Sequence, residues 1–357
     1  MEQSQIERTK RHYDLHANEV IPRKHALIKR SQSQTIQLKR FHNEVKRSLI
    51  ESFATRADHV LDLGCGRGGD LNKWFDAKIA NVVGVDLSQK EIQEAIKRLH
   101  ELRSKARGGV IRNRLVDTFN ARFLQSDSLG ISSPILFASN RHQFDAVTCM
   151  FALHYFFGTE HSLRNLLTTV SANLKVGGYF FGVCPDGRRV NDLLKKHNGT
   201  FTGLVFSCHI KNEDLPSLQF VSMEKDSRFG MTYTFALKDT ASDVTGEVED
   251  SDGSIEFMVF EDLLIEMAAE VDLVPVLEYD RLAFGKLLSL EATKYGLFKH
   301  FIPVYDNVEE LETVSKLNCA FTFVKVDPNN QSDRHTMGKR QLGYEEHEFR
   351  GEVNDTA

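Results

Sequence analysis

The sequence predicts an α/β fold, a doubly wound and mostly parallel sheet that is followed by an antiparallel insertion. Three observations predict it. Short β-rich runs alternate with helical segments between residues 59 and 183. A glycine-rich turn follows the first run, as at the ligand-binding edge of such sheets. After Cys184, strand-like segments follow one another without helices between them, which indicates antiparallel pairing.

Five runs rich in β-branched and aromatic residues predict the strands of the larger sheet. They are His59–Leu63, Asn81–Asp86, Ala121–Gln125, Phe144–Met150 and Tyr179–Val183. Strands that alternate with helices pair in parallel, and helices then cover both faces of their sheet.

Helical segments separate these strands. Helices are expected from Asp70 to Lys78, after Ser88, and from His161 to Leu174. Ser88 is a typical N-cap residue, and Glu91 stands at the capping-box position beyond it. The turn at residues 175–178 ends the third helix.

Four segments after Cys184 predict an inserted antiparallel subdomain: Phe201–Ile210, Pro216–Glu224, Met231–Lys238 and Ser254–Phe260. A helix at Glu261–Val271 and an apolar strand at Cys319–Val326 complete the core. From Asp327 onward the chain is polar and has little to bury, which predicts a disordered tail.

Composition limits the class of protein. The chain has 357 residues and a net charge of −5, which excludes a globally basic nucleic-acid binder. No apolar run approaches the roughly 18 residues of a membrane span, and Met1–Gln5 lacks the apolar core of a secretory signal. The five cysteines include no CxxC pair, so we expect a reducing intracellular compartment and neither a disulfide framework nor a zinc site.

Charge is segregated along the chain. Residues 21–50 carry eight Lys and Arg against one acid, and residues 97–114 carry seven against one. Residues 239–280 carry fourteen acids and no Lys or Arg. Local potentials of opposite sign follow, although each run alone is equally consistent with a solvated helix face.

The stretch Val60–Asp70 carries the clearest functional signal. Gly64, Gly66 and Gly69 satisfy the GxGxxG pattern, and Asp86 ends the next strand. By spacing alone this pattern also fits a dinucleotide-binding site. A glycine-rich turn without a ligand is the third interpretation.

Two acids beside the loop favour a different cofactor. Asp62 and Asp70 flank the glycines, and carboxylates there disfavour a pyrophosphate. They suit S-adenosylmethionine, which carries a sulfonium, an ammonium and a single carboxylate. The order acid-x-Gly-x-Gly-x-Gly is the recurring first motif of methyltransferases. Asp86 would then bind the ribose hydroxyls, and Asp127 would accept from the adenine amino group.

The residues after the fourth predicted strand bear on the methyl acceptor. No Asn-Pro-Pro-aromatic turn is present, and Cys184-Pro185 reverses the order that cytosine-C5 chemistry needs. Phe151–Tyr155 instead places His154 and Tyr155 at the carboxyl end of a strand, where ligands bind. They predict walls of a pocket for a flat acceptor, although a lone buried histidine is more often structural.

Taken together, the sequence resembles the mRNA cap guanine-N7 methyltransferase family from about Tyr13 to Val326. The matching elements are His12-Tyr13, Arg30–Ser33, Leu38–Ile50, Val60–Trp74, Gln125–Ser128, Phe151–Tyr155 and Ser254–Phe257. The resemblance implies a Rossmann-like class I methyltransferase core with an inserted antiparallel β cap-binding subdomain.

The family resemblance also implies a reaction. A methyl group would pass from S-adenosylmethionine to guanine N7 of the 5′ GpppN cap of mRNA, giving m7GpppN and S-adenosylhomocysteine. Guanine N7 has a free lone pair, so proximity and electrostatics would suffice for in-line transfer. Capped RNA is the implied substrate, the capping enzyme and the transcription machinery are implied partners, and the nucleus is the implied location. We expect no membrane and no structural metal.

By position, the resemblance assigns residues to three roles. Cofactor binding is implied for Lys46, Gly64, Asp70, Asp86, Asp127, Ser128, Met150 and Tyr155. Cap or RNA binding is implied for His42, Asn43, Arg67, Lys73, Arg98, His154, Glu256 and Asn318. Catalytic roles are implied for Glu256, His154 and Tyr155. Lys46 would pair with the methionine carboxylate. Glu256 would stabilise the cationic guanine, unless it is merely a surface acid on an edge strand.

The chain departs from the family pattern at three positions. The family usually has Asn, Gln and Tyr where this sequence has His42, Met150 and Asn318. These departures keep one alternative open, a catalytically divergent cap-binding paralogue. Another alternative, independent of them, is a small-molecule methyltransferase on the same fold. The basic segment Arg23–Arg47 argues against the second, because a small neutral acceptor does not need it.

The sequence thus divides into five predicted parts. A basic helical segment at 1–50 contributes to the cofactor and RNA site. A cofactor-binding core at 51–200 precedes the inserted cap subdomain at 201–260. Residues 261–326 complete the core, and 327–357 form the tail.

Overall fold

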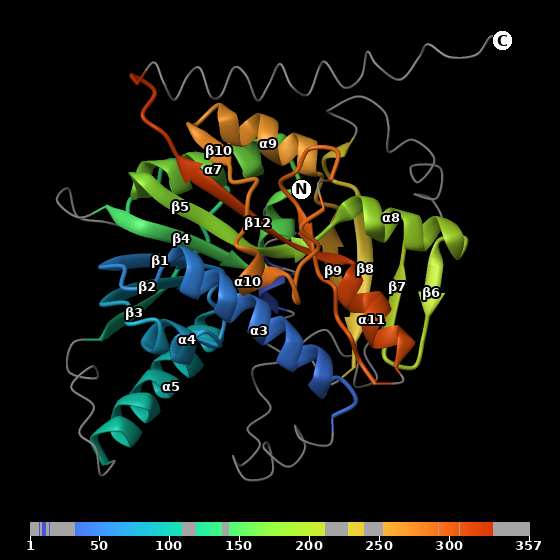
Figure 1. Ribbon diagram of the computed structural model, residues 1–357, viewed down its shortest axis with the longest axis horizontal. Helices are drawn as coiled ribbons and strands as arrows, with labels where there is room; N and C mark the ends of the chain where they lie inside the picture. The colour runs from blue at the N-terminus through green and yellow to red at the C-terminus, as the bar shows by residue number, and fades with distance from the viewer. Residues whose placement is uncertain are drawn as a thin grey trace.

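The structure is a computed structural model that describes residues 7, 9–11, 14, 33–108, 119–137, 143–210, 228–238, 253–291, 293–306 and 308–330. The predicted strand at Pro216–Glu224, the pair His12-Tyr13 and most of the predicted tail, residues 331–357, lie outside the described residues. Figure 1 shows two sheets, the larger one flanked by helices.

The larger sheet and its helices arise mainly from the first half of the chain. Their bounds are α3 (Ile36–Phe53), β1 (His59–Leu63), α4 (Leu71–Asp76), β2 (Asn81–Asp86), α5 (Gln89–Gly108), β3 (Asn120–Gln125), β4 (Phe144–Met150), the 3₁₀ helix η1 (Leu153–Phe156), α7 (Glu160–Asn173), β5 (Leu174–Pro185) and α8 (Gly187–Lys196).

The remaining elements build the smaller sheet and complete the larger one. Their bounds are β6 (Thr200–Thr202), β7 (Phe206–His209), β8 (Thr232–Leu237), β9 (Ser254–Phe257), α9 (Glu261–Ala269), β10 (Leu273–Pro275), α10 (Arg281–Phe284), β11 (Lys299–His300), α11 (Glu309–Lys316) and β12 (Asn318–Lys325).

The larger sheet confirms the predicted fold class. Its strand order is β10-β12-β5-β4-β1-β2-β3, with β11 also paired to β12. The pairs among β1 to β5 are parallel, whereas β12 runs antiparallel to β5. The chain winds outward from β1 to β3 and then returns to β4 on the other side. The carboxyl ends of β1 and β4 therefore form a topological switch point, where ligands bind in such sheets.

Two hydrophobic cores lie on opposite faces of the larger sheet. Alternation along β1 places Val60 in one core and Leu61 in the other. The first core is covered by α3, α4, α5 and α10, and it contains Trp74. The second is covered by α7 and α9. Burial on both faces explains why these strands read as continuous apolar runs.

The smaller sheet is antiparallel, with the order β6-β7-β8-β9. The register pairs Thr232 with Phe257 and Tyr233 with Glu256. Because successive side chains point to opposite faces of a strand, the first pair and the second pair lie on different faces of this sheet.

Two sequence predictions need correction. The predicted strand Phe201–Ile210 is a hairpin of β6 and β7, because the Glu310 carboxylate accepts the backbone N–H groups of Leu204 and Val205 and holds a turn there. The fifth strand begins at Leu174, directly after α7, and not at Tyr179. Its pairing shifts register opposite residues 144–146, which lets the strand start early.

Several elements were not predicted, namely α8, α10, α11, β10 and β11. Asp186 caps α8 by accepting from the Arg188 N–H, so a capping signal was present in the sequence. The five-part division of the chain stays a prediction. Among the described residues, no helix is long and apolar enough to span a membrane.

Candidate cofactor and acceptor site

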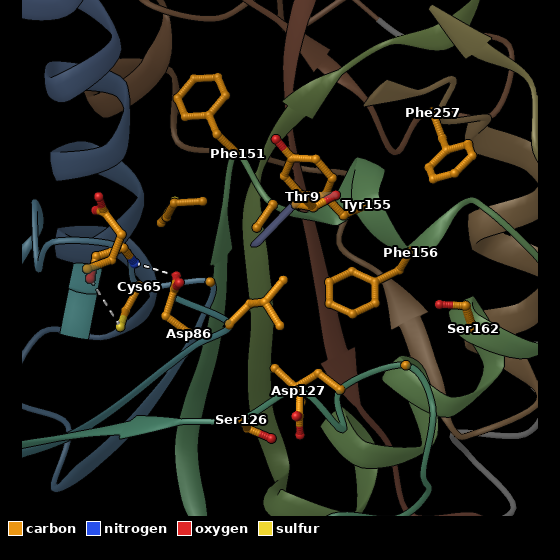
Figure 2. Close-up of a pocket in the computed structure, with 18 of the residues that line it drawn as sticks. Thr9, Cys65, Asp86, Ser126, Asp127, Phe151, Tyr155, Phe156, Ser162 and Phe257 are labelled. Carbon is orange, nitrogen blue, oxygen red and sulfur yellow. Dashed lines mark hydrogen bonds between the residues drawn. The ribbon is translucent and has the colours of Figure 1, made fainter. Parts of the chain in front are cut away.

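A cavity of about 740 Å³ opens at the carboxyl ends of β1 to β4. It lies at the topological switch point, with the glycine loop on one side and aromatic rings on the other. Figure 2 shows Cys65 and Asp86 on one side and Phe156, Phe257 and Ser162 on the other. Its size fits a ligand of several hundred cubic ångströms.

The loop after β1 makes a close approach to the end of β4. Gly64 has φ +75°, and a Cβ there would lie 2.4 Å from Ala152 Cβ. The Gly64 N–H donates to the Val85 carbonyl at 2.8 Å. Only glycine combines this backbone conformation with this contact. The loop therefore fixes the floor of the cavity.

Asp86, the last residue of β2, holds the same loop with its side chain. One carboxylate oxygen accepts from the Gly66 N–H at 2.8 Å, and the other accepts from the Ser88 N–H at 2.9 Å. Burial raises the pKa of Asp86, although these donors oppose the shift. A carboxylate has about four acceptor positions, so both oxygens keep capacity for ligand hydroxyls.

A buried ionic network joins α3 to the start of α4. Asp70 pairs with Lys46 at 2.8 Å and with Lys73 at 2.7 Å. Lys73 also donates to Asn43 Oδ1 at 2.7 Å. Burial would raise the pKa of Asp70, but the two ammonium groups outweigh it and lower the pKa to about 2. Lys46 and Asp70 line the cavity and present opposite charges to it.

Asp62 differs from the sequence interpretation, which placed it as an acid beside the cofactor. It is 2% exposed, does not line the cavity, and accepts from the Thr148 hydroxyl at 2.6 Å. Burial raises its pKa to about 7. Its position opposite Thr148 in the β1–β4 pair makes it a support beneath the loop.

Aromatic residues line the opposite wall. Phe151, Tyr155, Phe156 and Phe257 all reach the cavity. Phe151 adopts φ +61°, which is a strained conformation for a bulky residue. Its N–H still donates to the Val183 carbonyl at 2.8 Å. The change in backbone direction at Phe151 therefore comes directly after the last β4–β5 pair, Met150 with Val183.

A second polar group lies beside this wall. Glu256 accepts from the Tyr233 hydroxyl at 2.6 Å and from Ser254 Oγ at 3.0 Å. His154 Nε2 lies 3.9 Å from Glu256 Oε1. Burial lowers the pKa of His154, and neither ring nitrogen has a hydrogen-bond partner among the described residues. The neutral ring therefore keeps both a donor and an acceptor available.

The predicted residues fall into two groups. Those that line the cavity are Lys46, Gly64, Arg67, Asp70, Asp86, Arg98, Asp127, Met150 and Tyr155. Those that do not line it are His42, Asn43, Lys73, Ser128, His154, Glu256 and Asn318. Glu256 lies on the face of the smaller sheet opposite to Phe257. It is linked to the cavity wall through His154, whose ring contacts Tyr155. Ser128 follows Asp127.

Two predicted cap residues are engaged elsewhere. His42 Nε2 lies 2.8 Å from Ser315 Oγ. The Asn318 amide donates to the carbonyls of Val314 and Ser315 at 2.9 and 3.4 Å and so caps the end of α11. Two of the basic residues that line the cavity are also paired, Arg67 with Glu91 at 2.9 Å and Arg98 with Glu94 at 3.2 Å.

Sequence reasoning missed several residues near the cavity, and Thr9 and Asp14 are the least expected of them. Thr9 lines it. Asp14 accepts from the Ser88 hydroxyl at 2.6 Å, two residues beyond Asp86. Ser88 and Glu91 form the predicted N-terminal cap of α5 through Ser88 Oγ. No spacing in the sequence links positions 9 or 14 to this cap.

The comparison with family models decides the classification. The model of the mRNA (guanine-N(7))-methyltransferase domain matches residues 1–318. The chain belongs to this family.

Curated relatives agree with this assignment. The chain is 35% identical to the mRNA cap guanine-N(7) methyltransferase of Candida glabrata over 224 residues, 60% of this chain and 50% of that protein. It is 33% identical to mRNA cap guanine-N(7) methyltransferase 1 of Oryza sativa subsp. japonica over 242 residues, 67% of this chain and 60% of that protein. The chain thus spans about half the length of the first of these relatives.

The cofactor of this methyltransferase family member is S-adenosylmethionine, and the residues present fit it. Lys46 offers a cation for the methionine carboxylate, and Asp70 offers an anion for the ammonium group. Asp86 has acceptor capacity for two ribose hydroxyls, and the exposed Asp127 lies at the far side of the cavity. Among the described residues, no group of His, Cys, Asp and Glu is arranged to hold a metal.

Proposed function

We propose that this chain methylates guanine N7 of the 5′ GpppN cap of mRNA with S-adenosylmethionine as donor. The observation that carries the proposal is a methyl-donor cavity whose aromatic wall adjoins a fixed carboxylate, Glu256, and a neutral histidine, His154. A guanine base offers a flat ring to the aromatic wall and an N–H edge to the carboxylate.

Binding of the cofactor rests on four side chains. When bound, S-adenosylmethionine supplies an electrophilic methyl group on a sulfonium. Lys46 pairs with its carboxylate, Asp70 with its ammonium, Asp86 with its ribose and Asp127 with its adenine. The Lys46–Asp70 pair already exists in the protein, so these charges are held in place before the ligand arrives.

Binding of the acceptor rests on the aromatic wall and Glu256. Tyr155 packs on the His154 ring with centroids 4.1 Å apart, which makes a rigid surface for a purine. Glu256 has one donor on each oxygen and keeps acceptor capacity for the guanine N1–H and amino group. Methylation makes the guanine cationic, and a nearby carboxylate stabilises this charge as it develops.

No general base is required, because N7 carries a free lone pair. The side chains contribute by orientation: holding the reacting atoms in line and about 3–3.5 Å apart lowers the barrier by several kcal/mol. Arg67 and Arg98 at the cavity wall are the candidates for the triphosphate bridge. Both would exchange their carboxylate partners, Glu91 and Glu94, for phosphate oxygens.

The substrate class implies the cellular setting. Caps are made on nascent transcripts, so we place the reaction in the nucleus, with the capping enzyme and the transcription machinery as partners.

One assay tests the proposal. The chain is incubated with labelled S-adenosylmethionine and GpppA, GpppG-capped RNA or uncapped RNA, and nuclease digestion then locates the label. Label on the cap guanine alone is expected, with an affinity for capped RNA that falls as salt rises. Label on none of these, despite cofactor binding, would contradict the proposal.

A divergent cap-binding paralogue is the second candidate, because the Asn318 amide is committed to α11 and supplies no ring for stacking. Cap binding without methyl transfer in the same assay would support it. A small-molecule methyltransferase would neither bind the cap nor transfer a methyl group to it.

A further inference from the structure

Phe151 needs an external support for its backbone. Its φ is +61°. Among the described residues that line the cavity, no other residue except glycine has a positive φ. A bulky residue is strained in this conformation, which persists only where its surroundings enforce it. The kink delivers Ala152 against Gly64 and turns the chain into η1, which carries Tyr155.

His42 supplies such a support. Its ring stacks on the Phe151 ring with centroids 5.3 Å apart and an interplanar angle of 22°. The same His42 ring makes a T-shaped contact with the Phe301 ring, with centroids 5.2 Å apart. His42, on α3, is thus packed between Phe151 of the cavity wall and the Phe301 ring. It does not line the cavity itself.

The His42 ring is itself anchored from α11. Nε2 lies 2.8 Å from Ser315 Oγ, and Ser315 Oγ also lies 2.7 Å from the Tyr305 hydroxyl. This chain of contacts fixes the rotation of the imidazole. Burial lowers the pKa of His42 to about 3, so the ring is neutral at physiological pH.

We propose that His42 is a positioning residue: anchored on Ser315, it holds Phe151 in its left-handed conformation and so fixes the acceptor wall of the cavity. This role differs from a direct cap contact. The proposal rests on the proposed function in one respect: methylation of capped RNA is the activity by which a change in the acceptor wall is measured.

A double-mutant cycle tests the proposal. His42→Ala is expected to lower kcat/KM for capped RNA about tenfold while the cofactor Kd stays within about twofold. In the Phe151→Ala background, His42→Ala is expected to have no further effect, because the ring that it supports is already gone. His42→Phe, which restores a ring without the bond to Ser315, is expected to recover only part of the activity, because the ring then stacks without its anchor.

The cycle also separates positioning from general destabilisation. Additive losses in the double variant, or a His42→Ala loss that appears equally in cofactor binding, would overturn the proposal. The same four proteins are compared by urea unfolding, where His42 and Phe151 are expected to be energetically coupled. If the wild-type chain transfers no methyl group to capped RNA, the proposed function fails, and the unfolding cycle still decides whether His42 holds Phe151.

Discussion

Tyr233 and Glu256 face each other across the β8–β9 pair, and the Tyr233 hydroxyl donates to Glu256 Oε2 at 2.6 Å. The bond is buried, and burial raises the pKa of Tyr233 well above its usual range. The phenol therefore remains a donor at every accessible pH and holds one oxygen of the carboxylate. The orientation of Glu256 is set before any acceptor binds.

The first prediction concerns this carboxylate. Glu256→Ala is expected to lower turnover of capped RNA about a hundredfold, because the cationic guanine loses its counter-charge. Cofactor affinity measured by calorimetry is expected to stay nearly unchanged. Tyr233→Phe, which keeps the carboxylate but removes one of its donors, is expected to cost about tenfold. Unchanged turnover in Glu256→Ala would refute its catalytic role.

The second prediction concerns the cation at the cofactor end. Lys46→Ala is expected to weaken S-adenosylmethionine binding about ten- to hundredfold, because a charge-assisted bond to the ligand carboxylate is lost. Asp70 would keep its bond to Lys73. The matched control is Arg47→Ala on the next residue of α3, whose pair with Asp76 is exposed and contributes little. Calorimetry that finds equal affinities for the two variants would contradict the assignment of Lys46.

Much of the core could be predicted because burial leaves a pattern in the sequence. β1, β2 and β4 are apolar runs, β1 is followed by Gly64, and β2 ends at Asp86. Ser88 with Glu91 marks the start of α5. α11 was missed because its short apolar face, with Leu311 and Val314 buried, is hidden among acids. The hairpin at β6–β7 depends on Glu310, which lies far along the chain.

The site was predictable where a residue's role follows from its place at the end of a strand. Asp86 is such a case, since it ends β2 beside the glycine loop. Lys73 is not, because nothing in the neighbouring sequence indicates that it is buried between Asp70 and Asn43. The contact of His42 with Phe151 depends on how α3 lies over the sheet (Figure 1), and no local spacing encodes it.

The third prediction concerns pH. The pKa of Asp62 is raised to about 7 from 3.8, so between these values the folded chain binds a proton that the unfolded chain releases. This contribution to stability is fully present at low pH and is lost as pH rises toward 7. Between pH 5 and pH 8 the cofactor-free protein is expected to lose about 2 kcal/mol through this group, in order of magnitude.

Asp62→Asn removes that titration. Urea unfolding at pH 5 and pH 8 is therefore expected to show a smaller fall in the free energy of unfolding for this variant than for the wild type. The control is Asp58→Asn, an exposed position one residue before β1, which should retain the wild-type difference. An identical pH dependence in Asp62→Asn and the wild type would show that Asp62 does not titrate in this range.

The fourth prediction concerns the close approach of the glycine loop to β4. Gly64→Ala would place a Cβ 2.4 Å from Ala152 Cβ on a backbone with φ +75°, so both sterics and conformation oppose it. A cost of about 2–5 kcal/mol in unfolding free energy is expected, together with loss of cofactor binding. Gly69 lies in the same loop, its φ is outside the left-handed range, and an added Cβ would meet no atom within 4 Å. Gly69→Ala is therefore expected to change stability by about 0.5 kcal/mol or less. If urea unfolding found the two variants equally stable, the contact between the loop and the end of β4 would not be what requires glycine at position 64.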